Sequence, residues 1–360
     1  MTNSFRLGFL THFDGAGDPR RVYQNTLELY TAADQLGFDV GWIAQHHLQE
    51  ADGRLPSPFP FLAAAAERTK QIRLGTAVVI LPLEHPVRLA EDAAVVDTLS
   101  GGRLELGIGS GFDPVAYKAL GVDIEQRREL TTVGLHALQQ ALQGEPIGEG
   151  GPRLQPPAPT LANRLWQGIF SEQGARYAAE HGVGLLLNRA TYGYDEPTDQ
   201  VQLPWAKAYL ETWNGRATQP RIGLSRIVYP GADKRTTQAE LQDGILHAVK
   251  RLVKSGKFPD GLTTEGYFKR LHVFHGHPDE VSAELGADQV FPHITDLICQ
   301  FNPGVPNLDQ ALRAFELIAT KVAPALGWRP KREARVADRP ALNAAVTNGA
   351  LATPEVAYVR

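Results

Sequence analysis

Short apolar stretches alternate with longer amphipathic segments along most of the chain. Eight of the apolar stretches have the length of buried strands, and they lie at residues 5–10, 40–44, 72–80, 104–108, 165–170, 183–187, 222–229 and 297–301. The segments between them repeat apolar residues at the spacing of one helix face. Eight strand-and-helix units in this order predict an α/β fold, a single (β/α)8 TIM barrel of parallel strands.

The helices of this barrel are predicted from their caps and periodicity. The first begins at Asp18-Pro19, where a capping side chain precedes proline, and another starts at His85-Pro86. Further helices are expected up to about residue 143 and at residues 59–70, 172–180, 205–213, 241–252 and 308–322.

Three segments depart from the alternation. Residues 144–159 are rich in proline and glycine, which predicts an irregular connection, and residues 255–277 are expected to be an insertion. Residues 329–360 have weak periodicity and are rich in alanine, arginine, proline and asparagine. We therefore expect a barrel domain at residues 1–328 and an extended C-terminal tail at residues 329–360.

The composition indicates which class of molecule the chain binds. The chain has 360 residues, 43% hydrophobic and 21% charged, with a net charge of −4, and no run of lysine or arginine reaches five. This pattern disfavours nucleic acid and favours a small-molecule partner. The single cysteine, Cys299, excludes an internal disulfide framework, and neither a signal-peptide pattern nor an 18-residue apolar run occurs. We expect a cytoplasmic protein that does not insert into membranes.

Two adjacent histidines, His46 and His47, follow the second predicted strand directly. In β/α barrels the carboxyl ends of the strands carry the ligand site. Neighbours on a strand point to opposite faces, so only one of the two histidines faces the barrel interior. Taken alone, such a pair is more often packed or capping than catalytic. The first strand ends Thr11-His12-Phe13 and lacks the His-x-His of metal-dependent hydrolase barrels, so no metal site is expected.

Three sequence blocks point to a known family. They are residues 36–47, ending Gln45-His46-His47, residues 74–92, and residues 100–109. In order and spacing they resemble the luciferase-like flavin monooxygenases, the family of the bacterial luciferase α subunit. Two positions depart from the family pattern: Gln45 stands where Glu is common, and Ser110 stands where luciferase has an arginine that meets the flavin phosphate.

The resemblance implies roles for these residues. It places His46 beside the reactive edge of the flavin as the catalytic proton-transfer group, with His47 as a secondary contact to the cofactor. It implies a non-proline cis peptide bond at Ala77-Val78 against the flavin ring.

Two glycine-containing segments are candidates for the rest of the flavin site. The segment from Gly107 to Phe112 resembles a dinucleotide fingerprint, but Phe112 stands at the third glycine position, so we assign Gly109 and Ser110 to the flavin rim instead. Ser171 is either an ordinary helix cap or, with the amides of Gln173 and Gly174, a phosphate site. The missing positive charge is expected from Arg176 or Arg189.

The resemblance predicts an FMN-dependent monooxygenase that uses reduced FMN and O₂ to oxygenate a small organic substrate. Reduced flavin would come from a separate flavin reductase, and the family implies a homodimer. Two alternatives stay open: an F420-dependent oxidoreductase on the same barrel, and a barrel that binds flavin without turning it over. Residues 192–203 and 255–277 are expected to shape the substrate pocket.

Overall fold

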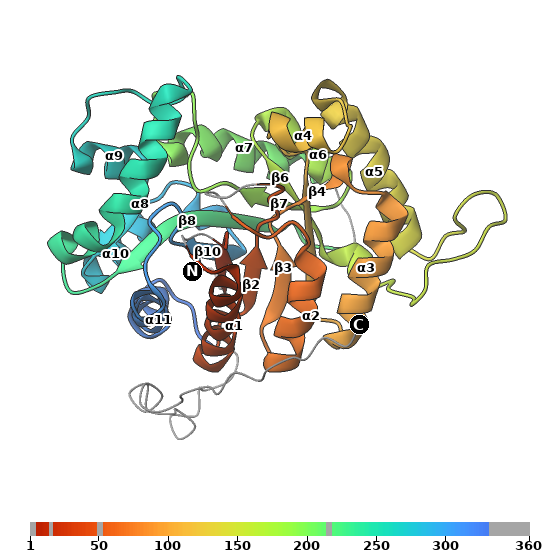
Figure 1. Ribbon diagram of the computed structural model, residues 1–360, viewed down its shortest axis with the longest axis horizontal. Coiled ribbons are helices and arrows are strands. Elements are labelled where there is room, and N and C mark those ends of the chain that lie inside the picture. Colours follow the sequence, from red (N-terminus) through yellow and green to blue (C-terminus); the bar gives the residue numbers. More distant parts are fainter. Residues whose placement is uncertain (1–4, 14–16, 49–52, 214–217, 331–360) are drawn as a thin grey trace, which may run out of the picture.

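The computed structural model describes residues 5–13, 17–48, 53–213 and 218–330. Its strands are all parallel, and β10 pairs with both β1 and β8, which closes the barrel (Figure 1). The predicted (β/α)8 fold is therefore confirmed. In chain order the strands are β1 (Arg6–Thr11), β2 (Val40–Ile43), β3 (Arg73–Thr76), β4 (Val79–Ile80), β5 (Leu104–Gly109), β6 (Leu165–Ile169), β7 (Gly184–Leu187), β8 (Ile222–Pro230), β9 (Val273–Gly276) and β10 (Asp296–Gln300).

Helices cover the outside of the barrel (Figure 1). The longer ones are α1 (Pro19–Leu36), α2 (Pro58–Arg68), α3 (Pro86–Leu99), α5 (Arg127–Leu142), α6 (Glu172–Glu180), α7 (Thr198–Thr212), α8 (Lys234–Lys254), α10 (Pro278–Gly286) and α11 (Leu308–Leu317). The first begins as predicted, because the Asp18 side chain accepts a hydrogen bond from the Arg20 amide ahead of Pro19. Of two short helices, α4 (Pro114–Ala119) follows the end of β5, and α9 (Thr264–Arg270) lies between α8 and β9.

The third predicted strand, residues 72–80, is not continuous. It is broken into β3 and β4 by a cis peptide bond between Ala77 and Val78. The Thr76 hydroxyl bridges the gap to β5: it accepts from the Gly107 amide at 2.9 Å and donates to the Gly107 carbonyl at 2.8 Å. A side chain thus replaces backbone pairing where the chain bulges.

Two other segments hold more structure than predicted. The segment 255–277 lies outside the closed barrel, as expected of an insertion, but it contains α9 and the four-residue strand β9, which pairs with the last residues of β8. A strand this short, with histidine and glycine at its end, leaves little alternation to detect. Helix α7 begins at Thr198, seven residues before the predicted start, because polar residues in its first turns hide the periodicity.

The barrel interior is filled by a small apolar cluster. It comprises Val40, Trp42, Trp166, Leu186 and Ile298, and the two indole rings meet edge to face with centroids 5.6 Å apart. A second, larger apolar core lies between the strands and the helices. On β2 the even-numbered residues therefore point inward, which sets the direction of the residues that follow the strand.

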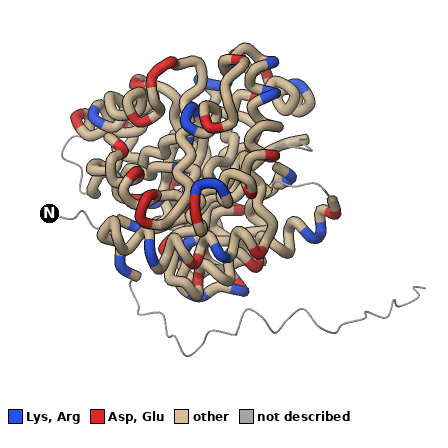
Figure 2. Tube along the Cα trace, turned by 90° about the vertical axis from the view of Figure 1, so that its left-hand side faces the viewer, with Lys and Arg blue, Asp and Glu red and all other residues tan. Residues whose placement is uncertain are grey.

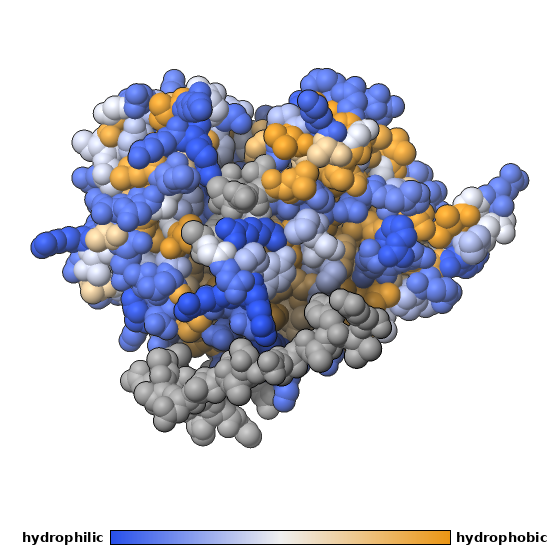
Figure 3. Space-filling view, in the orientation of Figure 1, coloured by the Kyte–Doolittle hydropathy of each residue, from blue (hydrophilic) through white to orange (hydrophobic). Residues whose placement is uncertain are grey.

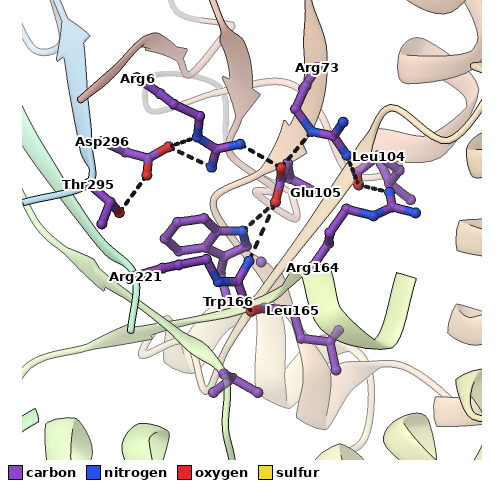
Figure 4. A network of polar contacts seen from close by, with 12 residues as sticks. Arg6, Arg73, Leu104, Glu105, Arg164, Leu165, Trp166, Arg221, Thr295 and Asp296 are labelled. Atoms are coloured by element: carbon purple, nitrogen blue, oxygen red, sulfur yellow. Dashed lines mark hydrogen bonds and ion pairs between the residues drawn. The ribbon is translucent and has the colours of Figure 1, made fainter. Parts of the chain in front are cut away.

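An ion network closes the barrel at the amino ends of the strands (Figure 4). Glu105, 2% exposed, accepts from Arg6 at 2.8 Å, from Arg73 at 2.6 Å and from the Trp166 indole N–H at 2.7 Å. Arg6 also pairs with Asp296 at 2.6 Å. Burial alone raises the pKa of Glu105, but the guanidinium groups of Arg6 and Arg73 outweigh burial and lower the pKa.

The surface charges are mixed in sign. Acidic and basic residues alternate over the face seen in Figure 2, consistent with the net charge of −4. Within the described ranges, no helix has both the length and the apolar character needed to cross a bilayer.

Replacing Glu105 by alanine should lower the free energy of unfolding by about 3 to 5 kcal/mol, because buried guanidinium groups lose their counter-charge. Glu91→Ala is the control. Glu91 pairs with Arg88 at 2.6 Å on the exposed surface of α3, where a pair contributes about 0 to 1 kcal/mol. Urea denaturation of both variants measures the difference, and equal losses would show that the network does not stabilise the barrel.

Candidate functional site

Four predicted site residues lie just past the carboxyl ends of four strands. His46 follows β2, Ala77 follows β3, Ser110 follows β5 and Ser171 follows β6. Because all strands are parallel, these residues share one end of the barrel, the end over which α4 lies in Figure 1. The end predicted to carry the ligand site is thus the end where they gather.

His46 points into the barrel interior, as the alternation from Trp42 predicts. Its Nε2 lies 3.3 Å from Nδ1 of His12, which follows β1. Nε2 of His12 lies 3.1 Å from Oε1 of Gln300, the last residue of β10. The Gln300 amide nitrogen in turn donates to the Ser225 hydroxyl on β8. Four strands contribute to one row of polar side chains across the barrel.

This row was missed in the sequence, where His12 counted only as evidence against a metal site. The signal was present: Leu10 packs in the interior cluster, so His12, two residues later, faces the same way. Burial, the charge of Arg189 and the charge that His46 gains on protonation hold the pKa of His12 well below its usual range. His12 is therefore neutral at physiological pH.

A glycine next to the His46 ring leaves room for it. Gly53 has φ of +127°, and a Cβ built on it would lie 2.8 Å from Cδ2 of His46 and 2.4 Å from the His12 carbonyl oxygen. The His46 amide donates to the Leu55 carbonyl at 3.0 Å. Only glycine fits at this position without moving the imidazole.

His47 lies beside an apolar cavity of about 480 Å³, lined by His46, His47, Leu48, Arg54, Pro56, Ala119 and Leu120. Burial lowers the pKa of His47, although the carboxylates of Glu84 and Asp113 act in the opposite direction. The Nε2 atom of His47 is buried and has no hydrogen-bond partner among the described residues. A buried polar atom of this kind indicates a position where a ligand can bond.

Gln45 makes side-chain hydrogen bonds that sequence reasoning did not find. Its amide nitrogen donates to Glu84 at 2.8 Å and to the Pro56 carbonyl at 3.0 Å, and its oxygen accepts from the Ile80 amide at 2.7 Å. Glu84 is 39 positions away in sequence, so no local pattern could reveal it. The carboxylate that Gln45 lacks is therefore supplied nearby by Glu84.

The cis bond implied at Ala77-Val78 is present, and it forms a bulge inside the barrel. The Val78 carbonyl accepts from the Gln45 amide at 3.4 Å, which places the bulge directly beside the histidines. A Cβ on Gly109 would lie 2.6 Å from Val78 Cγ2, and one on Gly168 would lie 3.1 Å from Val78 Cγ1. These glycines therefore make room for Val78, in addition to any approach of a ligand.

Ser171 is a helix cap in the structure. Its Oγ accepts from the Gly174 amide at 3.2 Å, so that amide is already used, whereas the amide of Gln173 has no such bond to the cap. The loops that carry Ser110 and Ser171 are adjacent, because Phe112 and Phe170 meet edge to face at 6.1 Å. Lys257 Nζ lies 5.3 Å from the Phe112 ring centroid, which puts a cation at the same part of the rim.

The two arginines suggested for the flavin phosphate differ in position. Arg176 pairs with Glu172 at 2.8 Å on the exposed side of α6 and also contacts Thr212. Arg189 follows β7 beside His12, and its Nε is buried without a hydrogen-bond partner in the described part of the chain. Arg189 is therefore the one directed toward the barrel mouth.

The rim above the site is apolar. Phe112 is 65% exposed, Leu48 69%, Val115 57%, Phe170 54% and Leu120 48%. Figure 3 shows apolar side chains gathered around α4, beside the mouth of the barrel. The segments expected to shape the pocket also meet, since the rings of Tyr192 and Phe258 are 6.3 Å apart. The arrangement can hold an apolar molecule against polar groups that move or hold a proton.

A comparison with protein families matches residues 5–290 to the luciferase-like monooxygenases. The chain is 38% identical over 327 residues to limonene 1,2-monooxygenase of Rhodococcus erythropolis, covering 85% of this chain and 82% of that protein. It is 36% identical over 283 residues to the alkanal monooxygenase α chain of the Kryptophanaron alfredi symbiont, which covers 73% of this chain and 76% of that protein. For three other curated relatives the chain spans 56%, 35% and 41% of their length.

Solved structures agree on the fold. The oxygenating constituent of 3,6-diketocamphane monooxygenase from Pseudomonas putida, in complex with FMN, has a TM-score of 0.74 at 20% identity and covers 91% of this chain and 100% of that one. The F420-dependent tetrahydromethanopterin reductase of Methanopyrus kandleri has a TM-score of 0.66 at 17% identity, and the match covers 90% of this chain and 100% of that one. At these identities the likeness concerns the barrel alone.

Replacing Gln45 by glutamate should lower the free energy of unfolding by about 1 to 3 kcal/mol, because the donor to Glu84 and to the Pro56 carbonyl is lost. Glu84→Gln in the same chain should recover part of this loss by reversing the direction of the 2.8 Å hydrogen bond. A double-mutant cycle by urea denaturation measures the coupling between the two positions. Strictly additive effects would mean that the two side chains do not interact.

Proposed function

The chain belongs to the luciferase-like monooxygenase family, and on that premise we propose that it uses reduced FMN and O₂ to insert one oxygen atom into a small apolar substrate. The observation that carries this proposal is the position of His46. It faces the barrel interior at the carboxyl ends of the strands, beside the Ala77-Val78 bulge, with an apolar cavity next to it. A titratable group at the base of an apolar pocket suits proton transfer near neutral pH.

The residues at the barrel mouth fit a flavin. Val78 and Ala77 offer an apolar surface for the ring system, and the buried, unpartnered atoms of His47 and Arg189 offer polar contacts. The Gln173 amide at the start of α6, where the Gly174 amide is bonded to Ser171, and the nearby loop with Gly109 and Ser110 would hold the phosphate end. Arg176 is paired with Glu172, and Arg189 acts on His12 at another part of the mouth, so the positive charge in this proposal comes from Lys257 beside Phe112.

The chain contributes positioning, exclusion of water and proton transfer. When bound, reduced flavin supplies the electrons that activate O₂ for oxygen transfer. The apolar rim and cavity favour a substrate with little charge, and they keep water from the reacting groups. Neutral His46 accepts a proton from the reacting group and returns it later, acting as a base and then as an acid.

Two partners follow from the same proposal. The FMN-bound structural relative is named an oxygenating constituent, which supports a separate flavin reductase as the source of reduced FMN for this chain. A homodimer is proposed from the family resemblance. The F420-dependent relative shares the barrel, so F420 hydride transfer is the alternative that the cofactor measurement must exclude.

The proposed phosphate site predicts that the chain binds FMN more tightly than riboflavin. We expect FMN to bind at least tenfold more tightly than riboflavin, because a charge-assisted contact contributes about 1.5 to 3 kcal/mol. Lys257→Gln should reduce this ratio, whereas Lys254→Gln, at the end of α8, should leave it unchanged. Fluorescence titration of FMN, riboflavin and F420 is the measurement. Equal binding of FMN and riboflavin would remove the phosphate site, and a preference for F420 would support the alternative.

His46→Ala should lower single-turnover oxidation of substrate by about 10²- to 10⁴-fold, with FMN affinity nearly unchanged, because a positioned acid or base is lost. His47→Ala should have a smaller effect, since His47 contributes a contact and no proton. His136→Ala, on the exposed face of α5, is the control. Wild-type turnover in His46→Ala would favour a chain that binds flavin without catalysis.

A further inference from the structure

We infer that His12 is a positioning residue that fixes the proton of neutral His46 on Nε2 and so leaves Nδ1 as its unprotonated nitrogen. The inference rests on the proposed function only for what that nitrogen does in catalysis. The arrangement of protons itself follows from the row Ser225, Gln300, His12, His46, which no family motif in the sequence includes.

The direction of the row is set at its far end. The Gln300 amide nitrogen donates to the Ser225 hydroxyl, so the amide oxygen faces His12. An amide oxygen can only accept, so the Nε2 atom of His12, 3.1 Å away, must carry a proton. Gln300 is 1% exposed and Ser225 5%, so water does not compete for these bonds.

The near end follows from the charge state of His12. A neutral imidazole has one N–H and one lone pair, and the N–H of His12 is already used by Gln300. Nδ1 of His12 is therefore an acceptor, and the atom 3.3 Å away, Nε2 of His46, must donate. The pKa of His12 is held low by burial and by the positive charges of Arg189 and His46, so the acceptor persists when His46 becomes protonated.

The charged groups around the pair act in the same sense. Arg189 faces His12 from the end of β7, and Arg54 lines the cavity beside His46. The carboxylates of Glu84 and Asp113 face His47, on the other side of the strand. Among the described residues, the charged group that acts on His12 besides His46 is therefore the positive Arg189, which opposes a proton on the second nitrogen of His12.

Fixing Nε2 has a consequence for catalysis. Because the His46 Nε2–H is committed to His12, a second proton on the His46 ring sits on Nδ1. The proton that His46 accepts during turnover returns by the same atom, and no charge moves along the row. Gly53, which has no side chain, leaves room for the His46 ring in this orientation.

The test is the tautomer of His46 in the ligand-free chain, read from ¹⁵N shifts of labelled histidine. The chain has 11 histidines, and His46→Gln identifies the signals of His46 by their loss. We expect the Nε2–H form in the wild type. Gln300→Leu leaves His12 in place but frees its proton to move, so the ratio of Nε2–H to Nδ1–H in His46 should fall roughly two- to tenfold, the effect of one neutral hydrogen bond.

Gln167→Leu is the matched control, because Gln167 is a buried glutamine on β6, a strand that contributes no residue to the row. Ser225→Ala is a milder second variant, to be used if Gln300→Leu does not fold. It lets the Gln300 amide turn, so the ratio of Nε2–H to Nδ1–H should fall in this variant too. An Nδ1–H tautomer in the wild type would overturn the inference, because it requires the reverse direction along the row. So would an unchanged ratio in Gln300→Leu and Ser225→Ala. None of these readings uses flavin, so they stand or fall independently of the proposed activity.

Discussion

The site depends on how the amino half of the barrel is closed. Glu105 is a buried carboxylate held by Arg6 and Arg73, and the indole N–H of Trp166 donates to it from inside the barrel. Trp166 then packs edge to face on Trp42, so the charge network fixes the apolar layer directly above it. A buried charge without these partners would be strongly unfavourable. The apolar layer thus separates the charged network at the amino end from the polar side chains at the carboxyl end.

The polar row above this layer follows from strand periodicity. Inward-facing residues recur every second position, so Trp42 leads to His46 and Ile298 leads to Gln300. Parallel pairing then holds the ends of β1, β2 and β10 beside one another and next to the middle of β8, where Ser225 lies. The polar residues are therefore neighbours in space although up to 288 positions separate them in the sequence.

Sequence reasoning reached the parts of the structure that periodicity governs. It predicted the strands, the barrel, the end that carries the site and the inward direction of His46. It did not find β9, whose four residues are too few to show a period, or the break between β3 and β4. Nor did it find the contacts of Gln45 with Glu84 or of His12 with Gln300, because such pairs depend on tertiary packing rather than on local pattern.

The hydrogen bonds of the Gln45 side chain explain why a neutral residue suits position 45. The surrounding groups require both a donor, for the Pro56 carbonyl, and an acceptor, for the Ile80 amide, and one amide side chain satisfies both. A carboxylate at position 45 would accept from Ile80 but could not donate. The negative charge stands instead on Glu84, outside the barrel interior, where it acts on His47. The strand thus separates the two histidines electrostatically: His47 faces carboxylates, whereas His46 shares the interior with Arg189 and a neutral His12. Adjacent residues of the same type therefore meet different charged groups on the two faces of one strand.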